Sequence, residues 1–274
     1  MRARRSASPP GSRPNSARPS PWPATAPRRR ARSACGIPPI SPLLLPPDFG
    51  TAMARLIFDL DGTLVDSLPA MLASANRMLT EFGRAPVSPE TCSDFVGRGV
   101  RVLVTRLLEH TGGLPGGDVE PALARYHAIY GADPVTGTTV YPGARRALMA
   151  LAAAGHGLAV CTQKPSGPAR DILTSLALMP PVSGLTCGDS LDVLKPDPRM
   201  FAHAAEQLPP GEAVVIGDGL ADAQLAAAAG VPFLLRMGGY GEQPRSDVPV
   251  AGRFTHFDEL PELVARVASA RVVS

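Results

Sequence analysis

Short apolar runs alternate with amphipathic stretches along most of this 274-residue chain. Five runs have the length and composition of buried strands, at 55–60, 158–161, 184–187, 213–216 and 231–235. Apolar residues recur at helical spacing in the stretches between and after them, at 144–154, 169–178, 198–207, 221–229 and 258–270. Alternating units with fully apolar strands predict an α/β fold, a doubly wound (Rossmann-like) parallel sheet covered by helices.

One stretch interrupts this alternation. Residues 67–138 contain helical patterns and no convincing strand. Apolar spacing predicts helices over 68–82, 100–110 and 119–130, and glycine follows each of them closely. We therefore expect a small helical cap domain at 67–138, inserted after the first strand into a catalytic core formed by 53–66 and 139–274.

Residues 1–52 differ from the rest in composition. They hold nine arginines, twelve prolines and a single acid, with no hydrophobic periodicity, so we expect them to be disordered. An organellar transit peptide or an interaction tail would explain the arginines, but the prolines oppose a targeting helix. We favour a start site placed too far upstream, because Met53 directly precedes the first strand.

The arginine-rich segment also masks the charge of the remaining residues. The whole chain carries +3, but beyond residue 52 it has 18 basic and 23 acidic side chains. This composition gives no indication of nucleic-acid binding.

No run approaches the ~18 apolar residues of a membrane span. The four cysteines lie far apart without a C-x-x-C pair, so we expect a reducing compartment, the cytoplasm.

Candidate chemistry begins where the first strand ends, in the run D-L-D-G-T-L-V-D-S at 59–67. The strand predicted over 55–60 delivers Asp59 and Asp61 to its carboxyl end, and residues two apart on a strand share a face, so we expect both carboxylates to address one point. Two carboxylates so near each other repel, unless a cation lies between them or one of them is protonated. This predicts either a metal site or a nucleophile beside a general acid. A calcium loop is excluded by Leu64 and Ala70, where it needs glycine and glutamate, while a solvated Asp-Gly turn remains the plain alternative.

Polar residues also follow the later strands, and in a parallel sheet these strand ends meet at one edge. They include Thr162, Gln163 and Lys164 after the second strand, Lys195 in K-P-D-P, and Asp218 and Asp222 after the fourth strand. Among 25 arginines the chain has only two lysines, Lys164 and Lys195. A compact ammonium can contact a phosphate and a carboxylate together, which favours a site role for Lys195. Lys164 could equally be a solvated loop residue.

Taken in order, these segments resemble the four motifs of the haloacid-dehalogenase-like phosphohydrolases. The first is D-L-D-G-T, the second contains Thr162, the third contains Lys195, and the fourth is acidic at Asp218 and Asp222. Four further segments resemble the phosphoglycolate phosphatase branch, F-V-G-R-G, Y-P-G, T-Q-K-P and G-G-Y-G. One departure is Gln163, where that branch usually has asparagine.

The resemblance implies a Mg²⁺-dependent phosphomonoesterase acting on a small phosphorylated metabolite, 2-phosphoglycolate in particular. Asp59 would attack phosphorus and form an aspartyl-phosphate, and Asp61 would protonate the leaving oxygen and later activate water. Asp59, Asp218 and the carbonyl of Asp61 would hold the metal, with Asp222 behind them.

The phosphoryl oxygens would be bound by Thr162, the amide of Gln163 and Lys195. For the rest of the substrate the candidate is Arg98, which lies between two glycines in a cap loop and can bind a carboxylate; a solvated arginine is the alternative.

Other functions share parts of this residue pattern. A phosphatase of another small ester such as a phosphosugar, and a sugar-phosphate mutase, remain open. Asp61 disfavours a dehalogenase, and the absence of lysine from 67–138 disfavours a phosphonate hydrolase. A non-catalytic binding protein with a degenerate site is disfavoured by the complete set of acidic and lysine residues.

Overall fold

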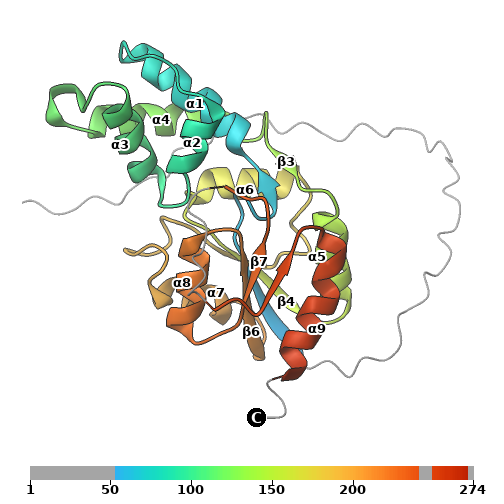
Figure 1. Ribbon diagram of the computed structural model, residues 1–274. Helices are drawn as coiled ribbons and strands as arrows, with labels where there is room; N and C mark the ends of the chain where they lie inside the picture. The colour runs from blue at the N-terminus through green and yellow to red at the C-terminus, as the bar shows by residue number, and fades with distance from the viewer. Residues whose placement is uncertain (1–52, 241–248, 271–274) are drawn as a thin grey trace, which may run out of the picture. The chain divides into compact units, whose positions relative to one another are not determined.

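The structure is a computed structural model that describes residues 53–240 and 249–270 (Figure 1). Our predictions for residues 1–52 lie outside these described residues. In the described part of the chain, no helix is long and apolar enough to cross a membrane.

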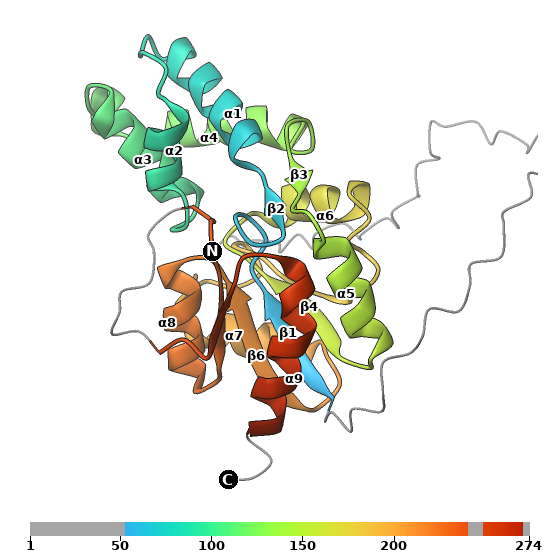
Figure 2. The same ribbon diagram turned by 45° about the vertical axis from the view of Figure 1, so that its right-hand side comes forward.

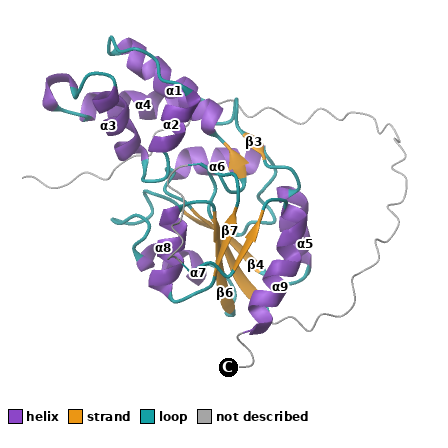
Figure 3. Cartoon of the chain, in the orientation of Figure 1, coloured by secondary structure: helices purple, strands orange, loops and turns teal. Residues whose placement is uncertain are grey.

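A sheet forms the centre of the fold (Figure 3). It has six parallel strands in the order β5-β4-β1-β6-β7-β8. Its strands are β1 (Ala54–Phe58), β4 (Gly157–Cys161), β5 (Gly184–Thr186), β6 (Glu212–Gly217), β7 (Phe233–Arg236) and β8 (Gly252–Phe254). The helices outside the insertion are α5 (Ala144–Ala153), α6 (Ser166–Ser175), α7 (Pro198–Glu206), α8 (Leu220–Ala229) and α9 (Leu260–Ala270). This parallel sheet covered by helices confirms the predicted fold class.

Strand β1 shows why both faces of the sheet must be covered. Leu56 and Phe58 pack into the cluster that includes residues of α5 and α9, whereas Ile57 packs on the opposite face with residues of α7 and α8. Figure 1 shows α5 and α9 on one side of the sheet and α7 and α8 on the other. Successive side chains of a strand point to opposite faces, so a strand buried on both sides must be apolar throughout.

Four helices fill the insertion after the first strand: α1 (Leu68–Glu81), α2 (Pro89–Phe95), α3 (Val100–His110) and α4 (Glu120–Ala132). They have a hydrophobic core of their own, in which Met78, Leu107 and Tyr126 are fully buried. The chain enters and leaves this helical unit through a two-stranded antiparallel pair, β2 (Val65–Asp66) and β3 (Thr139–Val140). Figure 2 shows this pair between the sheet and the four helices.

Some elements differ from the sequence-based expectation. Strand β1 ends at Phe58 rather than at residue 60. Helix α6 begins at Ser166, three residues earlier than expected, because a proline in the first turn of a helix is tolerated. The short elements β2, β3, β8 and α2 were not predicted, since two to seven residues are too few to establish a periodicity.

Candidate active site

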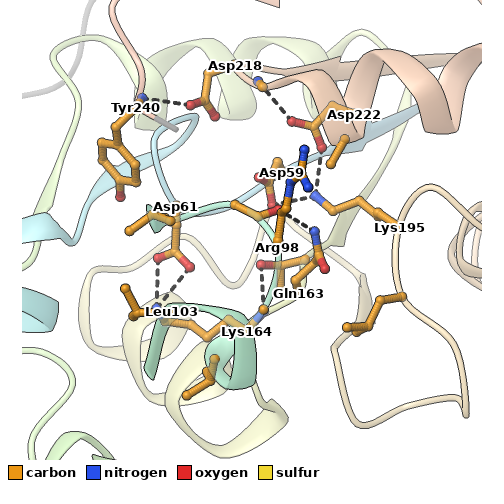
Figure 4. Close-up of a pocket in the computed structure, with 18 of the residues that line it drawn as sticks. Asp59, Asp61, Arg98, Leu103, Gln163, Lys164, Lys195, Asp218, Asp222 and Tyr240 are labelled. Atoms are coloured by element: carbon orange, nitrogen blue, oxygen red, sulfur yellow. Dashed lines mark hydrogen bonds and ion pairs between the residues drawn. The ribbon is translucent and has the colours of Figure 1, made fainter. Parts of the chain in front are cut away.

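A cavity of about 360 Å³ lies at the carboxyl ends of the central strands, and residues of the helical unit form its opposite wall. The core contributes most of the predicted site residues, namely Asp59, Asp61, Thr162, Gln163, Lys195, Asp218 and Asp222, and also Lys164, whose role the sequence left open. The helical unit contributes Arg98, Leu103, Tyr126 and Tyr130. Figure 4 shows how the charged side chains point toward one another across this space.

Asp59 lies directly after β1, where its backbone N–H still donates to the carbonyl of Ile216 in β6 at 2.9 Å. Its carboxylate contacts the ammonium of Lys195, with 3.0 Å between Nζ and Oδ1. The same ammonium donates to Asp222 at 2.7 Å. The side chain of Lys195 is only 2 % exposed, so one buried cation joins two acids that come from different strand ends.

Asp218, which follows β6, completes an acidic cluster. One ligand atom from each of Asp59, Asp218 and Asp222 lies within 4.8 Å of the others. Asp218 accepts hydrogen bonds from the Thr63 hydroxyl at 2.6 Å and from the Tyr240 N–H at 3.0 Å. These donors fix the direction of a carboxylate that is 2 % exposed.

Close backbone approach makes this cluster possible. A Cβ added at Gly62 would lie 2.4 Å from Oδ2 of Asp218, and the φ of +81° at Gly62 also favours glycine. At Gly217 an added Cβ would lie 2.3 Å from Cγ of Asp222. The glycines of D-G-T and G-D-G therefore leave the space that the carboxylates occupy.

Burial and mutual repulsion perturb the titration of this cluster. Burial raises the pKa of Asp59 to about 7, against the opposing effect of Lys195 and with a further rise from Asp222 and Asp61. Burial also raises the pKa of Asp218 well above its ordinary value, with a further contribution from Asp59 and Asp222. Burial lowers the pKa of Lys195, but the carboxylates of Asp222 and Asp59 together raise it above the ordinary value.

The residues present fit a hard divalent cation. All ligand groups in the cluster are carboxylates, and oxygen ligands are those that Mg²⁺ prefers. Burial and mutual repulsion raise the pKa of Asp59 and of Asp218, as expected where several carboxylates are incompletely balanced by positive charge. A divalent cation in this position would displace the protons and neutralise the charge.

The carboxylate of Asp61 is directed toward Lys164, which corrects the expectation that Asp59 and Asp61 share one strand face. Because β1 ends at Phe58, Asp61 lies in the following turn and does not share a strand face with Asp59. Its two carboxylate oxygens accept from the ammonium of Lys164 at 2.8 and 3.0 Å, and Oδ1 also accepts from the Ser67 hydroxyl at 2.5 Å. Lys164 is buried, so its reading as a solvated loop residue was wrong.

The other residues predicted to contact a substrate lie around the same cavity. Thr162 is buried at the end of β4, and its hydroxyl accepts from the backbone N–H of Lys164 at 3.2 Å. The side-chain amide of Gln163 donates to the carbonyl of Gly97 at 2.5 Å and so connects the core to the helical unit. Arg98 follows Gly97 and lines the cavity from that side (Figure 4).

Sequence reasoning gave no role to five residues that the structure places at the site. Thr63 holds Asp218, Ser67 holds Asp61, and Tyr240 contacts both Asp218 through its N–H and Ser67 through its hydroxyl. The signals were present in D-G-T and in G-G-Y-G. Tyr126 and Tyr130 of α4 also line the cavity, but their helical spacing is equally typical of a core.

The comparison with known proteins begins with the family. A model of the haloacid dehalogenase-like hydrolases matches residues 53–230. The chain belongs to this family. The match contains the acidic run after β1, the lysine of K-P-D-P and both acids after β6, and so confirms the resemblance inferred from these motifs.

Relatives within the haloacid dehalogenase-like hydrolases are also alike over nearly their whole length. A phosphoglycolate phosphatase from Cereibacter sphaeroides is 41 % identical over 216 residues, which cover 78 % of this chain and 99 % of the relative. One from Rhodospirillum rubrum is 39 % identical, over 76 % of this chain and 88 % of the relative. A crystal structure of a predicted phosphoglycolate phosphatase from Haemophilus somnus has a TM-score of 0.70 at 26 % identity, covering 77 % of this chain and 97 % of that chain.

Proposed function

We propose that this protein is a metal-dependent phosphatase that hydrolyses 2-phosphoglycolate to glycolate and phosphate. The observation that carries the proposal is the position of Asp59. It lies directly after β1, where its carboxylate contacts Lys195 and belongs to the cluster with Asp218 and Asp222, and Asp61 follows two residues further along the chain. The curated relatives that match most of this chain are named phosphoglycolate phosphatases, which favours that ester over others.

In the proposed reaction, a carboxylate oxygen of Asp59 forms a bond to phosphorus while the ester P–O bond breaks. The electron pair of that bond goes to the glycolate oxygen, which takes a proton from Asp61. In the second step Asp61 takes a proton from a water molecule that attacks phosphorus, which releases phosphate and regenerates Asp59. Lys195, Thr162 and the amide of Gln163 are proposed to bind the phosphoryl oxygens as charge develops on them.

The metal proposed for this site is Mg²⁺, held by Asp59, Asp218 and the carbonyl of Asp61. Bound there, it would neutralise the crowded carboxylates and polarise the phosphate. Asp222 is proposed to act on Lys195 rather than on the metal, because its carboxylate accepts from that ammonium at 2.7 Å and from the N–H of Gly219 at 3.2 Å.

The four helices α1–α4 are proposed to form the cap domain at 67–138, inserted into a core of 53–66 and 139–274. Two observations support this division, the separate hydrophobic core of the helices and the β2–β3 pair at their base. The cap supplies Arg98 to the cavity wall, and Arg98 is proposed to contact the substrate carboxylate. A closed cap would also keep water from the phosphoryl group.

The cytoplasm is the compartment we propose. Cys92, Cys161 and Cys187 are buried free thiols, the form that a reducing environment maintains.

The test is phosphate release from a panel of phosphorylated metabolites in the presence of Mg²⁺. We expect the highest kcat/KM for 2-phosphoglycolate and no turnover after chelation of the metal. A clear preference for a phosphosugar would assign the runner-up function, and isomerisation of a sugar phosphate without phosphate release would assign a mutase. Absence of turnover of any ester, including a generic aryl phosphate, would overturn the proposal.

A further inference from the structure

Lys164 occupies a position that the proposed reaction does not explain. Its ammonium donates to both oxygens of Asp61, at 2.8 and 3.0 Å, and its side chain is only 3 % exposed. Figure 4 shows the carboxylate of Asp61 turned toward Lys164, while that of Asp59 is turned toward Lys195. The group that must transfer a proton to the leaving oxygen is therefore held at a different cation from the nucleophile.

A buried ammonium requires an anion, because an unpaired charge out of water is costly. If Asp61 leaves Lys164 to reach the leaving oxygen, another anion has to take its place. The described residues nearest to this ammonium offer none besides Asp61: the other recorded neighbour of the ammonium is the ring of Tyr130, whose centre lies 4.7 Å away. An aromatic face attracts a cation only weakly compared with a carboxylate.

The ring of Tyr130, which faces this ammonium, carries a hydroxyl that lacks a partner in the described part of the chain. The hydroxyl of Tyr130 is buried and has no hydrogen-bond partner among the residues that the structure describes. Tyr130 is 3 % exposed and belongs to the cavity wall. A buried hydroxyl without a partner loses about 1–3 kcal/mol relative to one that is hydrogen-bonded, so a ligand with an acceptor is favoured there. The Lys164 ammonium from the core and the Tyr130 side chain from the helical unit, whose ring centre lies 4.7 Å from that ammonium, together suit a carboxylate.

We propose that Lys164 exchanges one carboxylate for another when substrate binds. Before binding, it holds Asp61. When 2-phosphoglycolate places its phosphate at Asp59 and Lys195, the substrate carboxylate contacts Lys164 and Tyr130, and Asp61 is released toward the ester oxygen. The exchange involves ion pairs and hydrogen bonds only, and the covalent steps remain those of the proposed phosphatase reaction, on which this inference rests.

The exchange connects substrate choice to the rate of the chemical step. An ester without a carboxylate leaves Asp61 on Lys164, so its phosphate can bind while the leaving oxygen receives no proton. Esters with and without a carboxylate then differ in kcat as well as in KM, because the contact of Asp61 with the leaving oxygen acts in the transition state. Arg98, on the cap side of the cavity, can add affinity for the same carboxylate.

The first experiment uses the wild-type enzyme with Mg²⁺ and divides the substrate into two parts. Methyl phosphate supplies the phosphoryl group and formate supplies the carboxylate; together they approximate 2-phosphoglycolate. We expect low millimolar formate to raise kcat for methyl phosphate severalfold with saturation, and chloride at equal ionic strength to have no effect. Formate that leaves the rate unchanged, or only inhibits, would overturn the exchange.

The second experiment compares 2-phosphoglycolate with 2-hydroxyethyl phosphate, which replaces the carboxylate by a hydroxymethyl group. Lys164→Met is expected to lower kcat/KM for 2-phosphoglycolate by at least about tenfold, the size of a lost charge-assisted contact. It is expected to raise kcat for 2-hydroxyethyl phosphate, because Asp61 is no longer held, and to abolish activation by formate. Equal losses on both esters would show that Lys164 only positions Asp61 and would overturn the exchange.

Two variants serve as controls. Lys195→Met is expected to lower turnover of both esters alike, since Lys195 is proposed to contact the phosphate that they share. Tyr130→Phe keeps the ring and removes the hydroxyl, and it is expected to raise KM for 2-phosphoglycolate selectively; equal effects on the two esters would contradict its part in the exchange. The proposed function and the exchange can fail separately. Efficient turnover of some other ester with poor turnover of 2-phosphoglycolate would overturn the proposed function. The formate experiment tests the exchange alone.

Discussion

Replacing Lys195 by methionine tests the electrostatic description of the site. The substitution keeps most of the side-chain volume and removes the ammonium that contacts both Asp59 and Asp222. We expect a less stable metal-free protein, because two buried carboxylates then repel each other without compensation. We also expect a loss of activity of about 10²–10³ in kcat, the usual effect of removing a donor to a developing oxyanion.

The distances set the size of the effect on stability. Each contact of Lys195 with a carboxylate, at 3.0 and 2.7 Å, corresponds to roughly 5–6 kcal/mol of gross attraction at an effective dielectric constant of ~20. Recovery of the hydration of the ammonium in the unfolded chain offsets much of this. Removing one partner of a buried ion pair typically costs about 3–5 kcal/mol, which for a domain of this size lowers Tm by roughly 10 °C.

The pH dependence has a definite sign. The pKa of Asp59 is raised to about 7, so folded protein binds more protons than unfolded protein between the ordinary value of 3.8 and that pH. Stability of the metal-free protein should therefore fall as pH rises through this interval, and more steeply without Lys195. At pH 5, where Asp59 is protonated, the variant should lose less stability than at pH 8.

The assay is thermal unfolding in a chelator at pH 5 and pH 8, repeated with excess Mg²⁺, which should reduce the deficit. Arg199→Met is the control, because Arg199 pairs with Asp192 and Asp197 at the surface and its loss should leave Tm unchanged at both pH values. A Lys195→Met protein with wild-type Tm at pH 8, or with the same deficit at pH 5 and pH 8, would refute the reasoning.

Three further predictions concern the chemistry. Asp59→Asn should abolish both turnover and binding of the beryllium fluoride analogue of the aspartyl-phosphate, whereas Asp61→Asn should slow turnover and still bind it; substantial activity in Asp59→Asn would exclude the mechanism. Mg²⁺ binding should release protons near pH 6, and the affinity for Mg²⁺ should increase as pH rises toward about 7, because burial raises the pKa of Asp59. Calorimetry in two buffers with different ionisation enthalpies measures the number of protons released. An affinity for Mg²⁺ that does not change with pH would contradict the prediction. Arg98→Ala should lower kcat/KM for 2-phosphoglycolate about ten- to a hundredfold more than for an aryl phosphate, and equal losses would show that Arg98 does not contact the carboxylate.

The positions that sequence predicted best are those fixed by a strand. Asp59 and Asp218 each follow an apolar run that can only be a buried strand, and parallel strands bring their carboxyl ends together. Lys195 was found through its motif and through the scarcity of lysine. For these residues backbone topology determines the location, so periodicity and a short motif were sufficient.

The direction of side chains beyond the strand ends could not be obtained in this way. Asp61 turns away from Asp59 because the chain leaves the sheet after Phe58 and turns at Gly62. Its partner Lys164 lies 103 residues further along the chain, and Tyr240 reaches Ser67 across 173 residues. Such contacts depend on how loops from different strands meet, and a local pattern of residues carries no information about that.

Each of the two lysines forms ion pairs with different acids of the cavity. These contacts give a physical reason for lysine at these two positions of a chain that otherwise uses arginine. Lys195 contacts Asp59 and Asp222 through one atom, and Lys164 contacts both oxygens of Asp61 through one atom while its charge faces the ring of Tyr130. A planar guanidinium spreads its charge over three nitrogens and needs more room than a site 2–3 % exposed provides. A compact ammonium can also leave one acid for another by a short movement of a flexible stem. The proposed nucleophile and the proposed proton donor are thus paired with separate ammonium groups, Asp59 with Lys195 and Asp61 with Lys164.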